Sequence, residues 1–263
     1  MRVAILGAGP AGIMAAGRAL ELGHSVQVFA HKMPSQLFGA QYLHCPPPIV
    51  YSQSFPIHYK LIGPAEGYRS KVYGENWAGD ISPNVIEEDH LGWDIRKAYF
   101  DLREQFGIDQ RHFTSFLDVE EAGILDNYDY VFSSIPRPAW KVDGEQFNHQ
   151  QVWAIGQPID EEPIVPWVPD NTVICNGDDS PSWYRASNIN GHRTVEWPHN
   201  GDTWRKRPMV PGVSAIKKPL EYIPSPSIPN PANDAFIHIG RYGRWEKGIL
   251  ASHAIQQVEE TLQ

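Results

Sequence analysis

The stretch Val3–Gly12, VAILGAGPAG, decides the fold. Val3–Leu6 is a short apolar run typical of a buried strand, and the small residues from Pro10 to Leu22 predict a buried helix. The segment SVQVF, residues 25–29, supplies the next strand. A strand, a helix and a second strand within about thirty residues form a βαβ unit. This part of the chain therefore predicts an α/β fold around a parallel sheet.

The turn between the first strand and the helix has the spacing of a dinucleotide-binding motif. Gly7, Gly9 and Gly12 stand at its G-x-G-x-x-G positions. Gly7 permits the tight turn, Gly9 lets the backbone approach a pyrophosphate, and Gly12 lets the helix pack close to the strand. Pro10 and Ala11 open the helix, whose first amide groups face the anion. We expect this turn to bind the phosphates of a dinucleotide.

The end of the second strand departs from that motif. An acidic residue usually stands there and binds a ribose hydroxyl, but Ala30 occupies the position, and His31 and Lys32 follow it. Either the ribose is held in another way, or a phosphate near it contacts Lys32. A 2′-phosphorylated nicotinamide cofactor therefore stays open as an alternative ligand.

The rest of the chain predicts a second unit interleaved with the first. Residues 34–93 are broken by proline and glycine, and we expect irregular structure there. The other expected elements are a helix at 94–106, a buried strand within 128–136, antiparallel strands at 151–156, 171–177, 183–189 and 192–197, a proline-rich connection at 208–231, a strand at 235–240 and a helix at 247–261.

A second glycine-rich turn, GRYGRWEKGIL, occupies residues 240–250. Like the first turn, it stands between an apolar run and a helix. A guanidinium can form two parallel hydrogen bonds with a phosphate. Arg241 is therefore a candidate to compensate the charge that one helix N-terminus leaves unbalanced. The two turns together predict two walls of one site for an elongated anionic ligand.

This order of motifs resembles the flavin-dependent oxidoreductases that include the amine oxidases and the UDP-galactopyranose mutases. The resemblance implies an FAD/NAD(P)-binding, Rossmann-like, three-layer α/β cofactor domain with an interleaved antiparallel β-sheet substrate domain. It implies that residues 1–44, 94–136 and 232–263 form the FAD-binding domain, and that residues 45–93 and 137–231 form the substrate domain.

The same resemblance implies FAD as the cofactor. Gly240 and Arg241 match a pair that binds the cofactor diphosphate in the mutases, and Gly248 and Ile249 would lie beneath the isoalloxazine ring. Arg96 is the early arginine of the second helix. The complete set of residues expected at the cofactor is Gly7, Gly9, Pro10, Ala11, Gly12, His31, Lys32, Gln41, Arg96, Gly240, Arg241, Gly248 and Ile249.

Residues 38–44 and 183–187 are also similar to segments of small flavin-dependent proteins encoded by bacteriophages. Some of those proteins are lyases that oxidise an amino acid attached to thymine in DNA. Three hypotheses follow. The first is an enzyme that oxidises a small C–N or C–O centre by hydride transfer to flavin. The second is a lyase acting on an amino-acid-modified thymidine, and the third is a non-catalytic dinucleotide-binding protein, which Ala30 favours.

Four residues from distant segments are the candidates for catalysis. Tyr42 and His44 follow the second strand, and His44 has the chemistry of a proton acceptor near neutral pH. Tyr184 and Arg185 lie near the start of the strand predicted at residues 183–189, and Arg185 can hold an anionic substrate group. We expect the four to line one pocket over the flavin. The alternatives are a locally bonded loop histidine and an ordinary packed sheet face.

Composition limits the class of partner. The 263 residues carry a net charge of −9 and have two cysteines, which together do not favour nucleic-acid binding or a metal site. Residues 192–210, with Lys217 and Lys218 beyond them, are locally basic, but we expect a solvated loop there rather than a DNA site. No targeting segment or long apolar run is recognisable. We expect a cytoplasmic protein, in the host cytoplasm if a phage encodes it, with a small-molecule or nucleotide-linked substrate.

Overall fold

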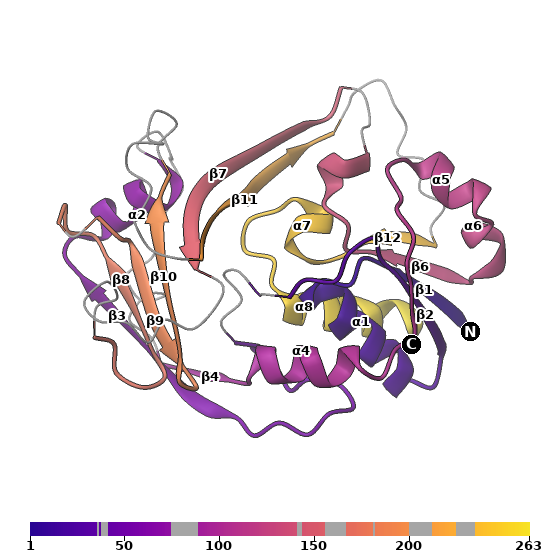
Figure 1. Ribbon diagram of the computed structural model, residues 1–263, viewed down its shortest axis with the longest axis horizontal. Helices are drawn as coiled ribbons and strands as arrows, with labels where there is room; N and C mark the ends of the chain where they lie inside the picture. The colour runs from indigo at the N-terminus through magenta and orange to yellow at the C-terminus, as the bar shows by residue number, and fades with distance from the viewer. Residues whose placement is uncertain are drawn as a thin grey trace.

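The computed structural model shows two lobes, each built on its own sheet (Figure 1). The residues that it describes are 1–35, 37, 42–74, 89–140, 144–155, 167–180, 182–199, 212–224 and 235–263. Both lobes are discontinuous in sequence, because the first sheet takes strands from the beginning, middle and end of the chain.

The first lobe is a three-layer α/β domain. Its sheet has the order β12-β6-β1-β2-β5, and all of its strand pairs are parallel. The strands are β1 (Arg2–Leu6), β2 (Ser25–Phe29), β5 (Ile108–Asp109), β6 (Tyr130–Ser133) and β12 (Phe236–His238). Val3 and Ile5 of β1 join one core, and Ala4 and Leu6 join the other. Because both faces are buried, the strand is an unbroken apolar run.

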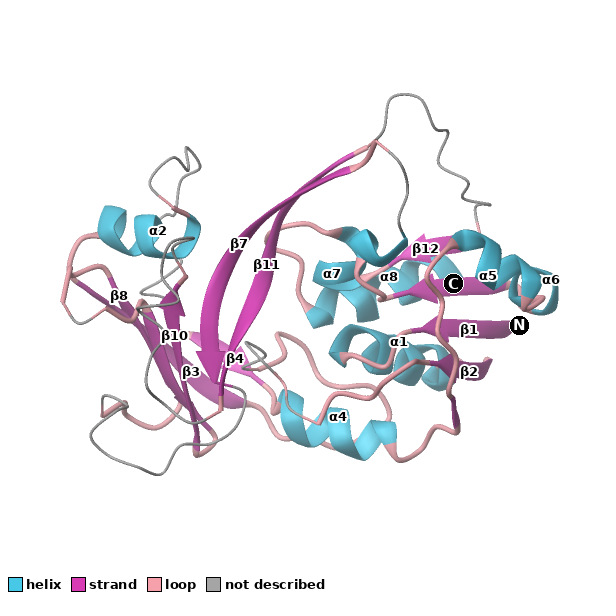
Figure 2. Cartoon of the chain, turned by 45° about the horizontal axis from the view of Figure 1, so that its top comes forward, coloured by secondary structure: helices cyan, strands magenta, loops and turns pink. Residues whose placement is uncertain are grey.

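Helices cover both faces of this sheet (Figure 2). One face carries α1 (Pro10–Glu21), α4 (Ile95–Arg103) and α8 (Ala251–Leu262). The other carries α5 (Phe116–Glu121), α6 (Ile124–Asn127) and the 3-10 helix η1 (Arg137–Trp140). The short helix α7 (Gly240–Arg244) stands between β12 and α8. Among the described helices, none combines the length and the apolar character needed to cross a membrane.

The second lobe is a seven-stranded sheet with the order β11-β7-β10-β9-β8-β3-β4. Its strands are β3 (Phe55–Ile62), β4 (His90–Gly92), β7 (Gln146–Ile155), β8 (Thr172–Asn176), β9 (Arg185–Ile189), β10 (His192–Pro198) and β11 (Val213–Ile223). The pair β3–β8 is parallel, and the other pairs are antiparallel. Helix α2 (Ala65–Tyr73) packs on one face through Tyr68 and Val72.

The strands β7 and β11 form a long ribbon that reaches from the second sheet to the first lobe (Figure 1). Near its outer end, Trp245 donates a hydrogen bond from Nε1 to the carbonyl oxygen of Asn148 at 3.0 Å. Arg137 of η1 donates to the Tyr222 hydroxyl at 2.9 Å. These contacts tie the ribbon to the first lobe, so the ribbon connects the two walls of the space between the lobes.

The expected fold class is confirmed, but three segments differ from expectation. Residues 34–93 contain β3, α2 and β4 rather than only irregular structure, and the segment 208–231 contains the strand β11. We did not predict β3 and β11 because proline usually interrupts a strand. Here Pro56 is the second residue of β3 and Pro219 lies at a β-bulge, and both positions accept proline. Part of the basic segment, residues 192–198, is the buried strand β10 rather than a solvated loop.

Candidate functional site

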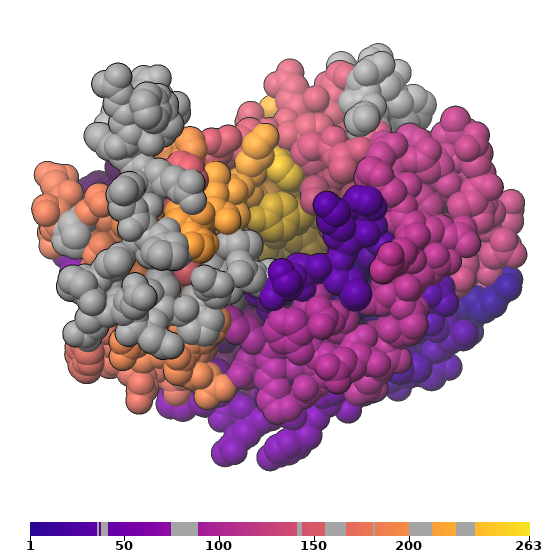
Figure 3. All heavy atoms as spheres, viewed as in Figure 1, coloured from indigo at the N-terminus to yellow at the C-terminus, as the bar shows by residue number. Residues whose placement is uncertain are grey.

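Two cavities meet at the first glycine turn. The first, of about 230 Å³, lies between the lobes and is lined by residues of α1, α7, the start of α8 and β11. The second, of about 380 Å³, lies beyond the turn at the end of β2. Gly9, Ser134 and Tyr242 line both cavities. Figure 3 shows the molecule hollowed between the lobes, with yellow C-terminal residues deep in the hollow. The two cavities therefore lie next to each other at the N-terminus of α1.

Close packing explains two of the three motif glycines. Gly7 has a φ of +97°, and a β-carbon there would lie 2.6 Å from the Ser134 Oγ. A β-carbon at Gly12 would lie 2.0 Å from the carbonyl oxygen of Gly7. At Gly9, by contrast, a β-carbon would meet no atom of the described residues within 4 Å. Gly7 and Gly12 therefore shape the turn, while Gly9 leaves the surface open to a ligand.

The N-terminus of α1 faces the part that the two cavities share. Pro10 is its first residue, and Gly9 precedes it without a side-chain capping hydrogen bond. The first N–H groups of a helix lack intrahelical acceptors and carry partial positive charge. The turn is held from behind by α4, because the Tyr99 hydroxyl donates to the carbonyl oxygen of Ala8 at 2.8 Å. This arrangement can bind an anion.

The second glycine turn closes the same site from the other side. Gly240 has a φ of +68°, and a β-carbon there would lie 2.4 Å from the Ala11 Cβ, so α7 lies directly against α1. Arg241 lines the first cavity, and its Nε donates to the carbonyl oxygen of Ile249 at 3.0 Å. Burial lowers the pKa of Arg241. It forms no ion pair with any described residue, so a ligand anion would compensate it.

The second cavity is basic. His31, Lys32, Arg111 and His112 line it, and the rings of His31 and His112 stack with their centroids 4.2 Å apart. The Arg111 Nε donates to Asp109 Oδ2 at 3.0 Å. Among the described residues that line this cavity there is no carboxylate. The missing acid at the end of β2 is therefore not replaced by another one on the cavity wall.

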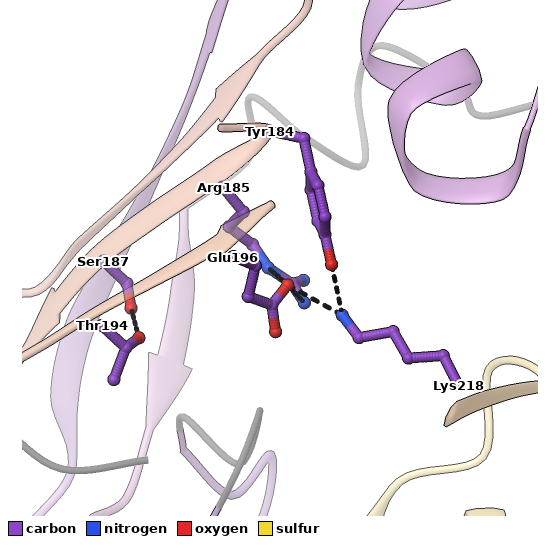
Figure 4. A network of polar contacts seen from close by, with 6 residues as sticks. All are labelled: Tyr184, Arg185, Ser187, Thr194, Glu196 and Lys218. Carbon is purple, nitrogen blue, oxygen red and sulfur yellow. Dashed lines mark hydrogen bonds and ion pairs between the residues drawn. The ribbon is translucent and has the colours of Figure 1, made fainter. Parts of the chain in front are cut away.

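The wall contributed by the second sheet holds a buried ion network (Figure 4). Glu196 of β10 accepts hydrogen bonds from Arg185 Nε at 2.8 Å and from Lys218 Nζ at 2.7 Å. Lys218 Nζ also lies 3.0 Å from the Tyr184 hydroxyl. Only 3% of the Glu196 side chain is exposed. Lys218 lines the first cavity, so one member of the network faces the ligand space.

The network contains two cations and one anion. Burial alone would raise the pKa of Glu196, but the charges of Arg185 and Lys218 lower it to about 2. Burial opposes the charged form of Arg185, yet Glu196 raises its pKa well above the usual value. Burial and the charge of Arg185 lower the pKa of Lys218 to about 7. Since Glu196 cannot fully compensate two cations, Lys218 is the member that releases its proton near neutral pH.

The four residues predicted for catalysis do not all face the cavity. Tyr42 lines it, and its hydroxyl donates to the Tyr59 hydroxyl at 3.2 Å. His44 lies beside Tyr42, with ring centroids 4.6 Å apart, but it is not among the described residues that line either cavity. Burial and the neighbouring His90 lower the pKa of His44. The described residues include no group of three or more side chains arranged to hold a metal ion.

Tyr184 and Arg185 do not face the cavity themselves, but they contact Lys218 and its partner Glu196. Tyr184 is buried and meets the cavity-lining Lys218, while Arg185 is engaged by Glu196. Neither is among the described residues that line the first cavity. Tyr42 thus faces the ligand space directly, whereas Tyr184 contacts the cavity-lining Lys218 and Arg185 contacts its partner Glu196.

Most of the residues predicted at the cofactor line a cavity. Those that line one or both cavities are Gly7, Gly9, Pro10, Ala11, His31, Lys32, Arg241 and Ile249. Gly12 and Gly240 pack behind the cavity wall, and the exposed Gly248 precedes Ile249. Arg96 lines neither cavity. Burial and the charge of Arg96 lower the pKa of His192, at the start of β10, to about 4. Gln41 lies outside the described residues.

Sequence reasoning missed Lys218, Glu196, Ser134 and Tyr242. The segment TVEW carries one usable signal, because in a strand Thr194 and Glu196 share one face while Val195 and Trp197 share the other. All four are buried, so both faces are covered and Glu196 needs cationic partners. Which cations meet it depends on strand register, which no local pattern contains.

No model of a protein family matches the sequence, and a comparison with curated proteins finds no match. Solved structures share its fold. A reduced UDP-galactopyranose mutase is 13% identical, with a TM-score of 0.53 over 99% of this chain and 93% of that one. A flavin-dependent brominase is 12% identical, with a TM-score of 0.54 over 99% and 78%. An oxidoreductase from Methanosarcina mazei is 11% identical, with a TM-score of 0.52 over 100% of both chains.

At these identities the likeness concerns the fold. It confirms the Rossmann-like, three-layer α/β architecture with a second sheet, which this chain shares with flavoproteins. The closer similarity to bacteriophage flavoproteins stays a prediction.

Proposed function

We propose that this protein is an FAD-dependent oxidoreductase. The observation that carries the proposal is a pair of adjacent cavities that share Gly9, Ser134 and Tyr242 at the uncapped N-terminus of α1, with Arg241 on the wall of the first. FAD has two phosphates between an adenosine and a flavin, so its shape and charge match this site. The α1 N-terminus, Gly9 and Arg241 would hold the diphosphate, the second cavity the adenosine and the first the flavin.

Bound FAD supplies the hydride acceptor, and the protein supplies binding, orientation and electrostatics. Because the first lobe would hold the cofactor, the substrate would lie toward the second sheet, where Tyr42 and Lys218 face the first cavity. We propose oxidation of a small C–N or C–O centre there. We place a lyase acting on amino-acid-modified DNA second, since a net charge of −9 does not favour a DNA substrate.

The substitution Gly9→Glu tests the placement of the diphosphate. The new carboxylate would project into the site and repel the phosphates, so we expect the purified variant to retain no flavin. Gly107→Glu is a matched control, because Gly107 is exposed and its β-carbon would also meet no described atom within 4 Å. Full flavin content in a folded Gly9→Glu variant would refute this placement.

One observation favours a second candidate, a 2′-phosphorylated nicotinamide dinucleotide. The second cavity presents Lys32 and Arg111 and, among its described lining residues, no carboxylate for a ribose diol. If this candidate is right, NADP⁺ will bind more tightly than NAD⁺, and Lys32→Gln will weaken NADP⁺ alone. Equal affinity for NADP⁺ and NAD⁺ would exclude the 2′-phosphorylated nicotinamide dinucleotide and leave FAD as the expected ligand.

A further inference from the structure

Among the described residues, Lys218 has acceptors for two of the three hydrogen-bond donors of its ammonium group. An ammonium group has three N–H donors, and the described residues account for two of them, at Glu196 and Tyr184. The side chain is only 12% exposed, yet it lines the first cavity. Its neighbour Lys217 is exposed on the same strand. No described residue accepts from the third donor of Lys218, and the cavity gives a ligand access to it.

The charges around Lys218 define what that ligand carries. Glu196 compensates one of the two cations that contact it, so the network has one positive charge in excess when Lys218 is protonated. Arg241, on α7, is the other described cation on the same cavity, and in the proposed function the cofactor diphosphate would compensate it. Among the described residues, the other titratable groups at this cavity are the hydroxyls of Tyr42 and Tyr242, with Tyr184 beside Lys218, and burial raises the pKa of all three, so they are neutral at physiological pH. A group with a single negative charge would balance the network.

The rest of the cavity wall is largely apolar. The lining residues Leu37, Ile95, Ile216, Ile239, Ile249 and Leu250 surround the polar groups. An apolar cavity with a few convergent polar groups is the usual form of a small-molecule site. The flavin would occupy the part of this cavity lined by the first lobe, which leaves Lys218 for a carboxylate and Ile216, on the second sheet, for an apolar body.

We propose that Lys218 is the anion-binding residue of the substrate site, and that the substrate is a small organic acid with an apolar body. This inference rests on the proposed function, because it takes the second sheet as the substrate wall. When the carboxylate binds, the neutral lysine amine takes up one proton from solvent and becomes an ammonium. Glu196 positions the amine and Arg185 holds Glu196.

Burial and the charge of Arg185, which lower the pKa of Lys218 to about 7, give the expected pH dependence. Above pH 7 the free protein holds a neutral amine, so each further pH unit should weaken carboxylate binding about tenfold. Below pH 7 the amine is already charged, and the affinity should be constant.

Calorimetric titration of the purified full chain tests the proposal. The probes are acetate, benzoate and phenylacetate, with benzamide as a neutral analogue, and each titration is made from pH 6 to 9 in two buffers of different ionisation enthalpy. We expect at least one carboxylate to bind with uptake of a proton above pH 7. Lys218→Met should weaken it about ten- to hundredfold, the value of a charged hydrogen bond, and should remove the pH dependence.

Two variants serve as controls. Lys217→Met removes the adjacent, exposed lysine and should change nothing. Lys218→Arg keeps the charge but does not titrate in this range, so it should preserve binding without the pH dependence. Carboxylate binding that is the same in wild type and Lys218→Met, or the absence of binding by all three acids, would overturn the inference.

Flavin content, measured on the same samples, separates this inference from the proposed function. Lys218-dependent binding in a protein that takes up no flavin would sustain the anion site and defeat the oxidoreductase proposal. Flavin uptake with Lys218-independent binding would do the reverse.

Discussion

At the residue scale, the site depends on a few side chains whose neighbours set their charge. Glu196 is buried and ionised because Arg185 and Lys218 contact the same oxygen. Lys218 is the weaker base of the two cations, so it is the one that burial brings near neutrality. The contact between Glu196 and Lys218 could not have been predicted from the sequence, because it depends on the order and register of the strands that carry them.

Glu196→Gln should destabilise the protein. The substitution leaves Arg185 and Lys218 buried without an anion, although Lys218 can release its proton and relieve part of the cost. We expect a loss of up to about 3 kcal/mol in the free energy of unfolding at pH 7, measured by urea denaturation. Glu259→Gln is the matched control, since Glu259 pairs with Arg18 at the surface and should cost no more than about 1 kcal/mol. Equal effects of the two substitutions would contradict the account.

Gly240→Ala and Gly248→Ala should differ in cost. Both glycines have positive φ, +68° and +84°, so each alanine pays about 1–2 kcal/mol for the left-handed backbone. Only at Gly240 would the new β-carbon also clash, 2.4 Å from the Ala11 Cβ, whereas Gly248 has no described atom within 4 Å. Thermal unfolding should show the larger loss for Gly240→Ala. The opposite order would mean that α7 does not pack against α1 as described.

At the element scale, local pattern predicts some segments and not others. The unit β1-α1-β2 could be predicted, because apolar runs and the spacing of Gly7, Gly9 and Gly12 are local features. The strands β3 and β11 could not, because Pro56 and Pro219 are normally signs of a break. Pro56 lies near the start of its strand and Pro219 lies at a bulge, where the missing N–H group is accommodated. These positions are known only once the strands are paired in the sheet.

The start of α4 offers a test at this scale. Asp94 caps the helix, its carboxylate accepting from the backbone N–H groups of Arg96 and Lys97 at 2.9 Å, and it also accepts from Asn190 Nδ2 at 2.6 Å. Asp94→Ala should cost about 1–2 kcal/mol in the free energy of unfolding. Asp94→Asn keeps a capping oxygen and should cost markedly less. Similar losses for the two variants would show that the cap contributes little.

At the scale of the whole molecule, the site exists because two lobes face each other. The wall that carries the two glycine turns could be predicted, since both turns are sequence motifs. The opposite wall could not, because Lys218 and Glu196 lie on different strands separated by β7 in the second sheet. Tyr42 lines the first cavity, while His44 packs beside it and is not among the described lining residues.

The stability of the whole molecule should fall in acid in two overlapping stages. Burial lowers the pKa of His238 to about 3 and, with the charge of Arg96, that of His192 to about 4. The unfolded chain therefore binds more protons than the folded one as pH falls from 6.5 to about 3, and stability is lost over that range. Glu196, whose pKa is lowered from 4.5 to about 2, adds a loss between those values. Urea midpoints measured from pH 8 to pH 3 should show the decline, and constant midpoints would contradict these assignments.

The most direct test of the central claim is the cofactor itself. The full chain, purified and denatured by heat, should release FAD in near-stoichiometric amount, identified by its visible absorption and by chromatography against FAD, FMN and NADP⁺ standards. A preparation that has lost its cofactor should regain the flavin spectrum when FAD is added. A colourless protein that takes up no added FAD would contradict the assignment of the two adjacent cavities to a flavin dinucleotide.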